Sequence, residues 1–275
     1  MTIVMPTYRR AQAIGGTIKT LLEGTWKDFE LLVRDDGDGS DGTREAVTAA
    51  ANGDRRVAYH RNARNLRMPG NLNEGIKESR GNFIAVCHDH DLYRPTFIET
   101  MVTTLRRNPT ALFVHCAIET IRQDGSVIQT HIGEWNELTP GGEWLKFMLS
   151  SLNCPVCALT VLRREAHEQY GLYDLSCGFI ADVEMWMRLS TRGDVAYVRE
   201  PLIKVCERED KHVETANSEH WIRMAAKIHR RYMTAAYGTT DQILRRIRLE
   251  LEFGNRYISD RSSRIARRLL PLSKS

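Results

Sequence analysis

Four consecutive titratable residues follow directly on an apolar run in this sequence. The run is Phe83 to Cys87, and the residues after it are His88, Asp89, His90 and Asp91. Carboxylate and imidazole groups are good ligands for Mg²⁺ and Mn²⁺, so the cluster could hold a divalent cation or a phosphate ester. A structural interpretation is also open, in which Asp91 caps the helix after Pro95 and Asp89 closes a turn.

The apolar run itself is typical of a central parallel strand. Continuous apolar residues of this length are expected where both faces of a sheet are covered. In an open α/β sheet, ligands bind at the carboxyl ends of such strands. The titratable cluster is therefore predicted to lie at the ligand-binding edge of a sheet.

Strands and helices alternate through residues 1–110. The predicted strands are Thr2–Met5, ended by Pro6, then Phe29–Arg34, Val57–Arg61 and the apolar run. The predicted helices are Ala13–Leu22, one after the loop Asp35–Thr43 with Asp41 or Ser40 as its N-cap, Asn71–Ser79 and Thr96–Arg107. This alternation predicts an α/β protein with a Rossmann-like, doubly wound, mostly parallel sheet, whose nucleotide-binding half comes first.

The pattern changes after residue 110. The predicted elements are a strand Ala111–Cys116, a hairpin within Glu119–His131, a helix Glu143–Ser151, a strand Cys157–Arg163 and a helix Asp182–Thr191. The turn of the hairpin is placed at Asp124-Gly125. We expect one domain over 1–212, with halves 1–110 and 111–212, in which a mixed second half of the sheet shapes an acceptor pocket. A helical, basic extension is expected over 213–275.

Composition excludes several classes of protein. The 275 residues are 42% hydrophobic and 27% charged, as in ordinary globular proteins. No apolar run reaches the ~20 residues that a membrane span needs, and no signal-peptide pattern is present, so a cytoplasmic protein is expected. The net charge of +4 gathers in the tail, and a near-neutral body argues against a nucleic-acid partner. The six cysteines are expected to be reduced thiols, because Cys154 and Cys157 have no second metal-binding pair.

The end of the tail leaves two interpretations open. Three apolar residues lie among four arginines there, namely Ile265, Leu269, Leu270, Arg261, Arg264, Arg267 and Arg268. They could form an amphipathic helix at the inner face of a membrane, as a peripheral contact. They could equally form a solvated helix that packs on its own domain or on a partner, and a homodimer is left open in the same way.

Four motifs, in order along the chain, resemble the inverting family-two glycosyltransferases of the GT-A fold. The motifs are Pro6–Arg9, Asp35–Gly37 with Ser40–Thr43, Asn62–Leu66 with Asn71–Ile76, and Gly81–Asp91 with Pro95. The resemblance implies an enzyme that moves a sugar from a nucleotide-diphosphate sugar to an acceptor hydroxyl with inversion. A UDP-sugar is the favoured donor, and the implied acceptor is a glycan, a lipid-linked molecule or a small molecule.

The resemblance also implies the residues of the donor site. The acid at the end of the second strand would accept a hydrogen bond from the base, which fits Asp36 with Asp35 beside it, and Asp89 would hold the ribose. The other implied residues of this site are Pro6, Thr7, Tyr8, Arg9 and Arg64. Arg67 stands where the family usually has glycine, and it would either contact the diphosphate or be exposed.

A divalent ion, Mg²⁺ or Mn²⁺, is implied as the group that neutralises the leaving diphosphate. Its implied ligands are Asp89, His90 and Asp91, with His212 as a further one. His90 stands where the family usually has a carboxylate, and imidazole also binds Mn²⁺. His212 could instead be an exposed histidine.

The implied catalytic base lies in the stretch Gly178–Leu189, which resembles the family's acidic pair at the start of a helix. Ala181 replaces the first acid of the pair, and Asp182 is retained. A carboxylate there is expected to stay ionised through the helix dipole, and to take the proton of the acceptor hydroxyl. The alternatives are that Asp182 is only an N-cap, or that Glu184 is the base.

Two other functions are weighed against sugar transfer. A sugar nucleotidyltransferase would carry a glycine-rich phosphate loop after the first strand, and Pro6 to Arg10 contain no glycine. A non-catalytic relative that binds a sugar nucleotide or a glycan is favoured by His90 and Ala181, the two departures from the family pattern.

Overall fold

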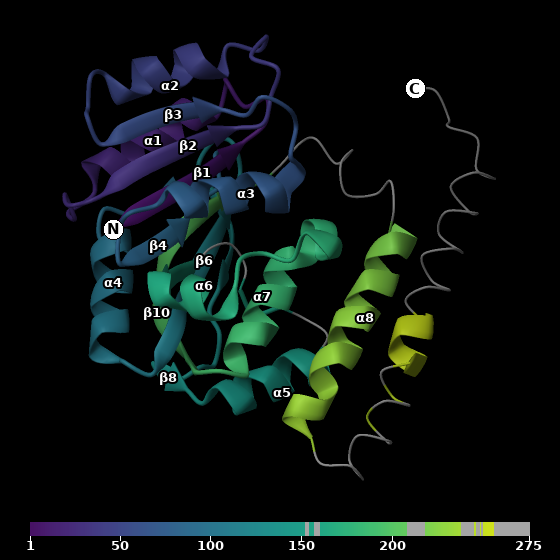
Figure 1. The fold of residues 1–275 in the computed structure, drawn as a ribbon. Coiled ribbons are helices and arrows are strands. Elements are labelled where there is room, and N and C mark those ends of the chain that lie inside the picture. The colour runs from purple at the N-terminus through teal and green to yellow at the C-terminus, as the bar shows by residue number, and fades with distance from the viewer. Residues whose placement is uncertain are drawn as a thin grey trace. The chain divides into compact units, whose positions relative to one another are not determined.

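Within the described residues, a ten-stranded sheet forms the centre of the fold (Figure 1). Its strand order is β3-β2-β1-β4-β9-β6-β10-β5, with β7 beside β6 and β8 beside β10. The strands are β1 Thr2–Thr7, β2 Glu30–Asp35, β3 Val57–Arg61, β4 Phe83–Val86, β5 Leu92–Tyr93, β6 Ala111–Ile121, β7 Val127–His131, β8 Leu138–Thr139, β9 Thr160–Arg163 and β10 Asp194–Cys206.

This computed structural model describes residues 1–151, 154–156, 160–207, 218–237, 245, 248 and 250–255. The chain divides into two compact units, Met1–Glu207 and Arg208–Ser275. The expected domain boundary after residue 212 lies outside the described residues, as does the end of the basic tail.

The parallel and mixed halves of the sheet are both as predicted. Strand β1 pairs in parallel with β2 and with β4, and β2 pairs in parallel with β3. Strand β9 runs antiparallel to β4 and β6, while β10 runs parallel to β6. The predicted hairpin is β6–β7, closed by a backbone hydrogen bond from Arg122 N–H to the Ser126 carbonyl oxygen at 2.9 Å.

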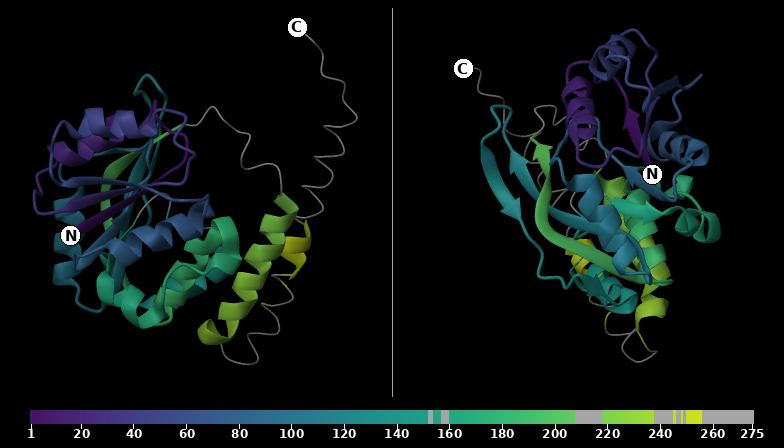
Figure 2. Two further views of the ribbon diagram at one scale, coloured as in Figure 1. Left: turned by 45° about the horizontal axis from the view of Figure 1, so that its top comes forward. Right: turned by 90° about the vertical axis from the view of Figure 1, so that its left-hand side faces the viewer.

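Helices cover both faces of the sheet. Helices α1 and α2 lie on one face of the β1–β3 region, and α3 lies on the other (Figures 1 and 2). Their inward residues are apolar, so that Ile14, Ile18 and Leu21 of α1 are almost fully buried. The helices are α1 Ile14–Glu23, α2 Thr43–Ala51, α3 Arg67–Glu78, α4 Phe97–Arg107, α5 Gly141–Ser151, α6 Arg164–Tyr170, the 3-10 helix η1 Leu175–Ile180, α7 Ala181–Ser190 and α8 Ser218–Ala236.

Pro6 does not end the first strand, contrary to the prediction. Strand β1 continues to Thr7, with Pro6 opposite Arg34 of β2. Strand β4 pairs with β1 only as far as Val86, so the N–H that Pro6 lacks is not needed by β4.

The starts of two helices also differ from the predictions. Helix α3 begins at Arg67 rather than Asn71, because Pro69 is tolerated in a first helical turn. Helix α2 is capped by Gly42, which has a left-handed φ of 81°, and not by Asp41 or Ser40. Asp41 accepts instead from the Thr43 hydroxyl at 2.6 Å. Helix α6 and the full length of β10 were not predicted.

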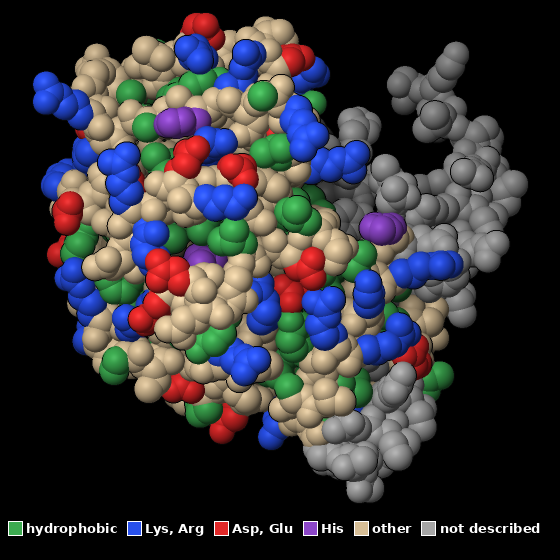
Figure 3. Space-filling model, viewed as in Figure 1, with side chains coloured by type: hydrophobic (Ala, Val, Ile, Leu, Met, Phe, Trp, Pro, Cys, Tyr) green, Lys and Arg blue, Asp and Glu red, His purple; other side chains and the backbone are tan. Residues whose placement is uncertain are grey.

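The surface and the helices bear on possible partners. Acidic and basic side chains are interspersed over the face of the molecule shown in Figure 3. Among the helices that the structure describes, none is long and apolar enough to cross a membrane. The described cysteines Cys87, Cys116, Cys154, Cys177 and Cys206 are free thiols.

Candidate functional site

Three neighbouring strands deliver polar side chains to the same edge of the sheet. Strand β1 ends at Thr7, β2 is followed by Asp36, and β4 leads into the 88–91 cluster. Backbone hydrogen bonds fix these ends side by side, since Asp36 N–H donates to the Thr7 carbonyl and Cys87 N–H to the Val4 carbonyl, both at 2.9 Å. Because β1 lies between β2 and β4, the predicted donor residues and the titratable cluster share one edge.

His88, His90 and Asp91 form the candidate metal centre. One possible ligand atom from each residue lies within 4.8 Å of the other two. The two imidazole rings are parallel, with centroids 5.6 Å apart. His88 is 41% exposed while Asp91 is fully buried, so an ion would approach from the His88 side.

Asp91 is fixed by two elements and does not cap α4. Its Oδ2 lies 3.0 Å from His88 Nδ1, and its Oδ1 accepts from the backbone N–H of Cys206 at the end of β10, at 3.2 Å. The N-cap of α4 is Thr96, without a side-chain hydrogen bond. The structural interpretation of Asp91 as a helix cap is therefore wrong.

Asp89 supports His90 and lies outside the group of three. Its Oδ1 is 2.9 Å from His90 Nδ1, and His90 Nε2 lies 3.8 Å from Asp91 Oδ1. Burial of Asp89 raises its pKa, but the hydrogen bond to His90 and the charge of Arg10 lower that pKa by more, so it is below its usual value. A carboxylate on the second ring nitrogen is the usual support of a metal-binding histidine.

His88 was named in the cluster but was not among the implied metal ligands. The sequence does carry a signal for it, because His88 adjoins the three implied ligands, and the turn at residues 89–90 brings its ring near that of His90. The fourth implied ligand, His212, lies outside the described residues.

Asp35, the last residue of β2, and Asp36, which follows it, are both hydrogen-bonded within the protein. Asp36 accepts at 2.8 Å from Asn62 Nδ2, Leu66 N–H and Arg67 N–H. A carboxylate has about four acceptor positions, so capacity for one more donor remains. Asp35 is fully buried and accepts from Gly37 N–H at 2.8 Å and from the Tyr59 hydroxyl at 2.5 Å. Burial and that bond to Asp35 raise the pKa of Tyr59 to about 12.

The remaining implied donor residues are mostly exposed. Tyr8 is 49% exposed, and Arg9 lies 5.5 Å from its ring centroid and forms an ion pair with Asp38 at 2.9 Å. Arg64 is also exposed, as is Arg67. Both Arg9 and Arg67 adopt left-handed backbone conformations, with φ of 55° and 62°. Such conformations are costly for residues other than glycine and often occur at functional sites.

Asp182 is the second residue of α7, whose N-cap is Ile180. Asp182 is therefore not the N-cap, although its Oδ1 accepts from Val183 N–H at 2.8 Å. Burial raises the pKa of Asp182, while that hydrogen bond and the charge of His88 lower it by less. Burial therefore outweighs the effect of the helix start on the pKa of Asp182, and its ionised state stays a prediction. The effect of His88 puts Asp182 within electrostatic range of the candidate metal centre.

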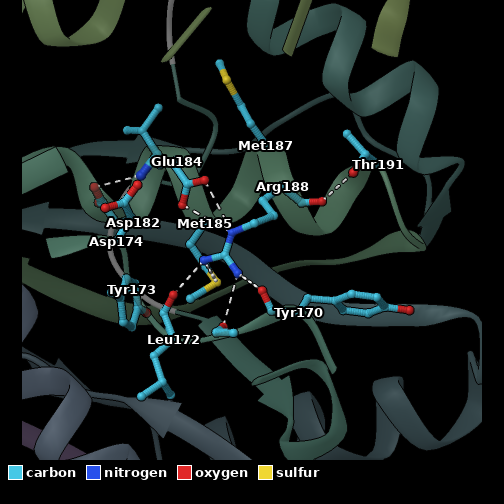
Figure 4. A network of polar contacts seen from close by, with 12 residues as sticks. Tyr170, Leu172, Tyr173, Asp174, Asp182, Glu184, Met185, Met187, Arg188 and Thr191 are labelled. Carbon is cyan, nitrogen blue, oxygen red and sulfur yellow. Dashed lines mark hydrogen bonds and ion pairs between the residues drawn. The ribbon is translucent and has the colours of Figure 1, made fainter. Parts of the chain in front are cut away.

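Glu184 is buried and paired with an arginine of its own helix. It is 1% exposed, and both of its oxygens lie 3.3 Å from Nε of Arg188, one turn further along α7 (Figure 4). This pairing with Arg188 favours Asp182 over Glu184 as the candidate base.

With this geometry in place, comparison with known proteins gives the family. The sequence pattern described as Glycosyl transferase family 2 matches residues 2–171. This chain belongs to glycosyl transferase family 2. The family assignment agrees with the resemblance drawn from the four motifs, and it covers most of the first unit.

The matches to curated relatives in the family cover part of each relative's length. An uncharacterised glycosyltransferase of Rickettsia conorii is 26% identical over 206 residues, which are 74% of this chain and 32% of that protein. The UDP-Glc:alpha-D-GlcNAc-diphosphoundecaprenol beta-1,3-glucosyltransferase WfgD of Escherichia coli is 31% identical over 108 residues, 39% of this chain and 42% of that protein. The match to the Rickettsia relative thus spans about a third of that relative's length.

Solved structures of glycosyltransferases share the fold. TarS 1–349 of S. aureus, in complex with UDP-GlcNAc, has a TM-score of 0.70 at 15% identity and covers 94% of this chain and 72% of that one. Mannosyltransferase PcManGT from Pyrobaculum calidifontis, in complex with GDP-Man and Mn²⁺, has a TM-score of 0.62 at 17% identity. The match covers 98% of this chain and 76% of that one. The predicted GT-A fold is confirmed.

Proposed function

We propose that this chain is an inverting glycosyltransferase that moves a sugar from a nucleotide-diphosphate sugar to an acceptor hydroxyl. The observation that carries the proposal is the meeting of Asp36 and the 88–91 cluster at one sheet edge, with Asp182 in electrostatic range of His88. The name of the Escherichia coli relative includes a UDP-sugar and a diphosphoundecaprenol acceptor, which supports a UDP-sugar as donor here.

The donor would lie across the ends of β1, β2 and β4. Asp36 would use its remaining acceptor capacity for an N–H of the base, and Asp89 would accept from the ribose. Pro6, Thr7 and Tyr8 would line the slot, with Asp35 behind Asp36. The exposed arginines Arg9, Arg64 and Arg67 would meet the negative charge of the diphosphate.

The metal would be held by His88, His90 and Asp91. Two imidazoles and one carboxylate suit a transition ion such as Mn²⁺ better than Mg²⁺, which prefers oxygen ligands. The bond between His90 and Asp89 fits this role, because it fixes the ring that would carry the ion. When bound, the ion would neutralise charge on the departing diphosphate.

Asp182 would act as the base of a single displacement. It would take the proton of the acceptor hydroxyl while that oxygen forms its bond to the anomeric carbon and the bond to the diphosphate breaks. Attack from the side opposite the leaving group inverts the anomeric centre. The raised pKa of Asp182 makes it a better proton acceptor once it is ionised.

A lipid-linked acceptor is the one that the relatives favour. The Campylobacter jejuni relative, 28% identical over 120 residues that are 43% of this chain and 38% of that protein, is named GalNAc(5)-diNAcBac-PP-undecaprenol beta-1,3-glucosyltransferase. Such an acceptor would bring this chain to a membrane surface from the cytoplasm, and the basic tail would provide the peripheral contact. A homodimer remains a proposal without a described interface.

Hydrolysis of UDP-sugars tests the proposal without a known acceptor, because water can replace the acceptor hydroxyl. We expect Mn²⁺-dependent release of UDP by the wild type, and a loss of about 100-fold or more in Asp182→Asn. The wild-type rate should fall as the pH drops through the raised pKa of Asp182, since the protonated acid cannot accept a proton. The rate is measured by UDP release between pH 5 and pH 8.

The matched control is Asp174→Asn, which changes a nearby acid at the N-cap of η1, where it accepts from Ser176 N–H. This variant should keep the wild-type rate. Saturable UDP binding without turnover, in wild type and Asp182→Asn alike, would instead identify the non-catalytic binding relative.

A further inference from the structure

Arg188 of α7 is bonded to the backbone that precedes the proposed base. Its guanidinium donates to the carbonyl oxygens of Tyr170, of Gly171 at 3.1 Å and of Leu172 at 2.7 Å (Figure 4). These carbonyls lie at the end of α6, where the last carbonyls of a helix have no partner within the helix. One side chain therefore ties the end of α6 to α7.

Glu184 sets the direction of this guanidinium. The two side chains form an ion pair at 3.3 Å within α7, and the side chain of Glu184 is 2% exposed. A planar guanidinium held by a carboxylate presents its outer N–H groups in a fixed direction, which an ammonium group does not. The direction of Arg188 toward the α6 carbonyls is thus built into α7.

Tyr173, the residue after Leu172, is hydrogen-bonded to a side chain of α3. Asn73 Oδ1 accepts from Tyr173 N–H at 3.0 Å, and Asn73 Nδ2 donates to the Tyr173 carbonyl at 2.9 Å. Helix α3 also carries, at its first residue, the Arg67 N–H that binds Asp36. The segment 170–173 therefore joins the helix of the proposed base to the helix that contacts the proposed donor site.

We infer that Arg188 is a positioning residue for Asp182, because its fork of hydrogen bonds, made from the last turn of α7, fixes this helix relative to α3 and the donor residues. The inference rests on the proposed function, in which Asp182 must face the anomeric carbon. Arg188 touches neither donor nor acceptor, and it acts by holding Asp182 in register. A misplacement of ~1 Å at a reacting group can cost about 100-fold in rate.

Helix α7 has a second source of stability, which makes the inference testable. Met185, Trp186, Met187 and Leu189 are all buried, so apolar packing holds α7 in the fold when the Arg188 bonds are weakened. Arg188→Lys keeps the charge and loses the fork, and Glu184→Gln keeps the shape and loses the ion pair. Arg192→Lys is the matched control, because Arg192 is exposed and lies over the ring of Tyr170, 5.9 Å from its centroid.

The experiment compares turnover with donor binding in the full chain. Hydrolysis of UDP-glucose, UDP-galactose and UDP-N-acetylglucosamine is measured with Mn²⁺, and the Kd of UDP with Mn²⁺ is measured by calorimetry. We expect kcat to fall about 100-fold in Arg188→Lys and less in Glu184→Gln, while the Kd of UDP stays within about two-fold. Arg192→Lys should match the wild type. Amide hydrogen exchange at residues 171–182 should quicken in Arg188→Lys but not in Arg192→Lys.

Two results would overturn the inference. One is an unchanged kcat in Arg188→Lys, and the other is a loss of UDP affinity as large as the loss of kcat, which would indicate general damage to the fold. A wild type that binds UDP but hydrolyses none of the three sugars would refute the proposed function instead. Hydrogen exchange would then decide the role of Arg188 alone, and equal exchange in both variants would reject it.

Discussion

His115 is a buried titratable side chain for which the described part of the chain provides no hydrogen-bond partner at either ring nitrogen. It lies in β6 between the rings of Trp144 and Tyr197, at centroid distances of 6.2 and 4.9 Å. Burial lowers its pKa from 6.5 to about 3. His167 is also buried, and its pKa is lowered to about 4, chiefly by burial. Both rings are therefore neutral in the native protein at pH 5.

These two histidines should make the protein less stable in mild acid. In the unfolded chain each ring takes up a proton below pH 6.5. In the folded chain each ring stays neutral until the pH falls to its lowered pKa. Stability therefore falls as the pH drops below 6.5. We expect a loss of about 1.4 kcal/mol per histidine in the free energy of unfolding between pH 7.5 and pH 5.5, measured by urea titration. His115→Leu should remove the part of this loss that is due to His115. The variant should be no less stable than the wild type at pH 7.5, because an unpaired polar group is replaced by an apolar one.

The control for this prediction is His60→Leu, at an exposed position of β3. It should leave in place the loss of stability that the two buried histidines cause. A His115→Leu variant that loses stability between pH 7.5 and pH 5.5 as steeply as the wild type would show that His115 is protonated in the fold.

At the scale of elements, Asp36 connects the end of β2 to the start of α3. Its three hydrogen bonds include the N–H groups of Leu66 and Arg67, which open the helix. Asn62 adds a further link, because Arg34 Nη2 donates to its Oδ1 and its Nδ2 donates to both Asp36 and Asn71. The start of α3 is thus held by buried polar groups.

Asp36→Asn should weaken both the fold and donor binding. The amide cannot accept at all three positions, so one hydrogen bond is lost, which costs about 1 kcal/mol in the free energy of unfolding, since Arg67 N–H also donates to Asn65 Oδ1 at 2.9 Å. The Kd of UDP should also rise, because the proposed contact to the base is lost. Urea unfolding and calorimetry give the two quantities. Asp38→Asn, in the exposed pair with Arg9, is the control and should change stability little.

Unchanged UDP affinity in Asp36→Asn would contradict the donor role of Asp36 and leave it only a structural one.

Local patterns predicted the elements better than their ends. The apolar run Phe83–Cys87 and the helix behind it were recognisable because burial requires a strong pattern there. The path of β1 through Pro6 was not recognisable from the sequence, because it depends on where the neighbouring strand β4 ends. Helix α6 has seven residues, too few for a clear apolar period.

The positions of the candidate site residues were predicted better than their environment. The motifs placed Asp36 and the 88–91 cluster at one sheet edge, since the carboxyl ends of parallel strands lie at the same edge of a sheet. The raised pKa of Asp182 could not be predicted, because it depends on burial by segments far away in the chain. The network of Arg188 likewise joins carbonyl oxygens that no side-chain pattern reveals.

At the scale of the whole molecule, the first unit combines two halves with separate tasks. The parallel half presents the proposed donor residues, and the mixed half presents Asp182 on α7. Asn73 and Arg188 join the halves through the segment 170–173. The second unit, Arg208–Ser275, holds α8, and its basic end is the part proposed to meet a membrane.

The most direct measurement of the central claim is a crystal structure of the full chain with UDP and Mn²⁺, with the ion located by anomalous scattering. We predict Mn²⁺ bound by His88, His90 and Asp91, the base of UDP at Asp36, and the Asp182 carboxylate facing the diphosphate across an open acceptor space. Mn²⁺ bound elsewhere, or an Asp182 side chain turned away from the nucleotide into packed protein, would contradict the account.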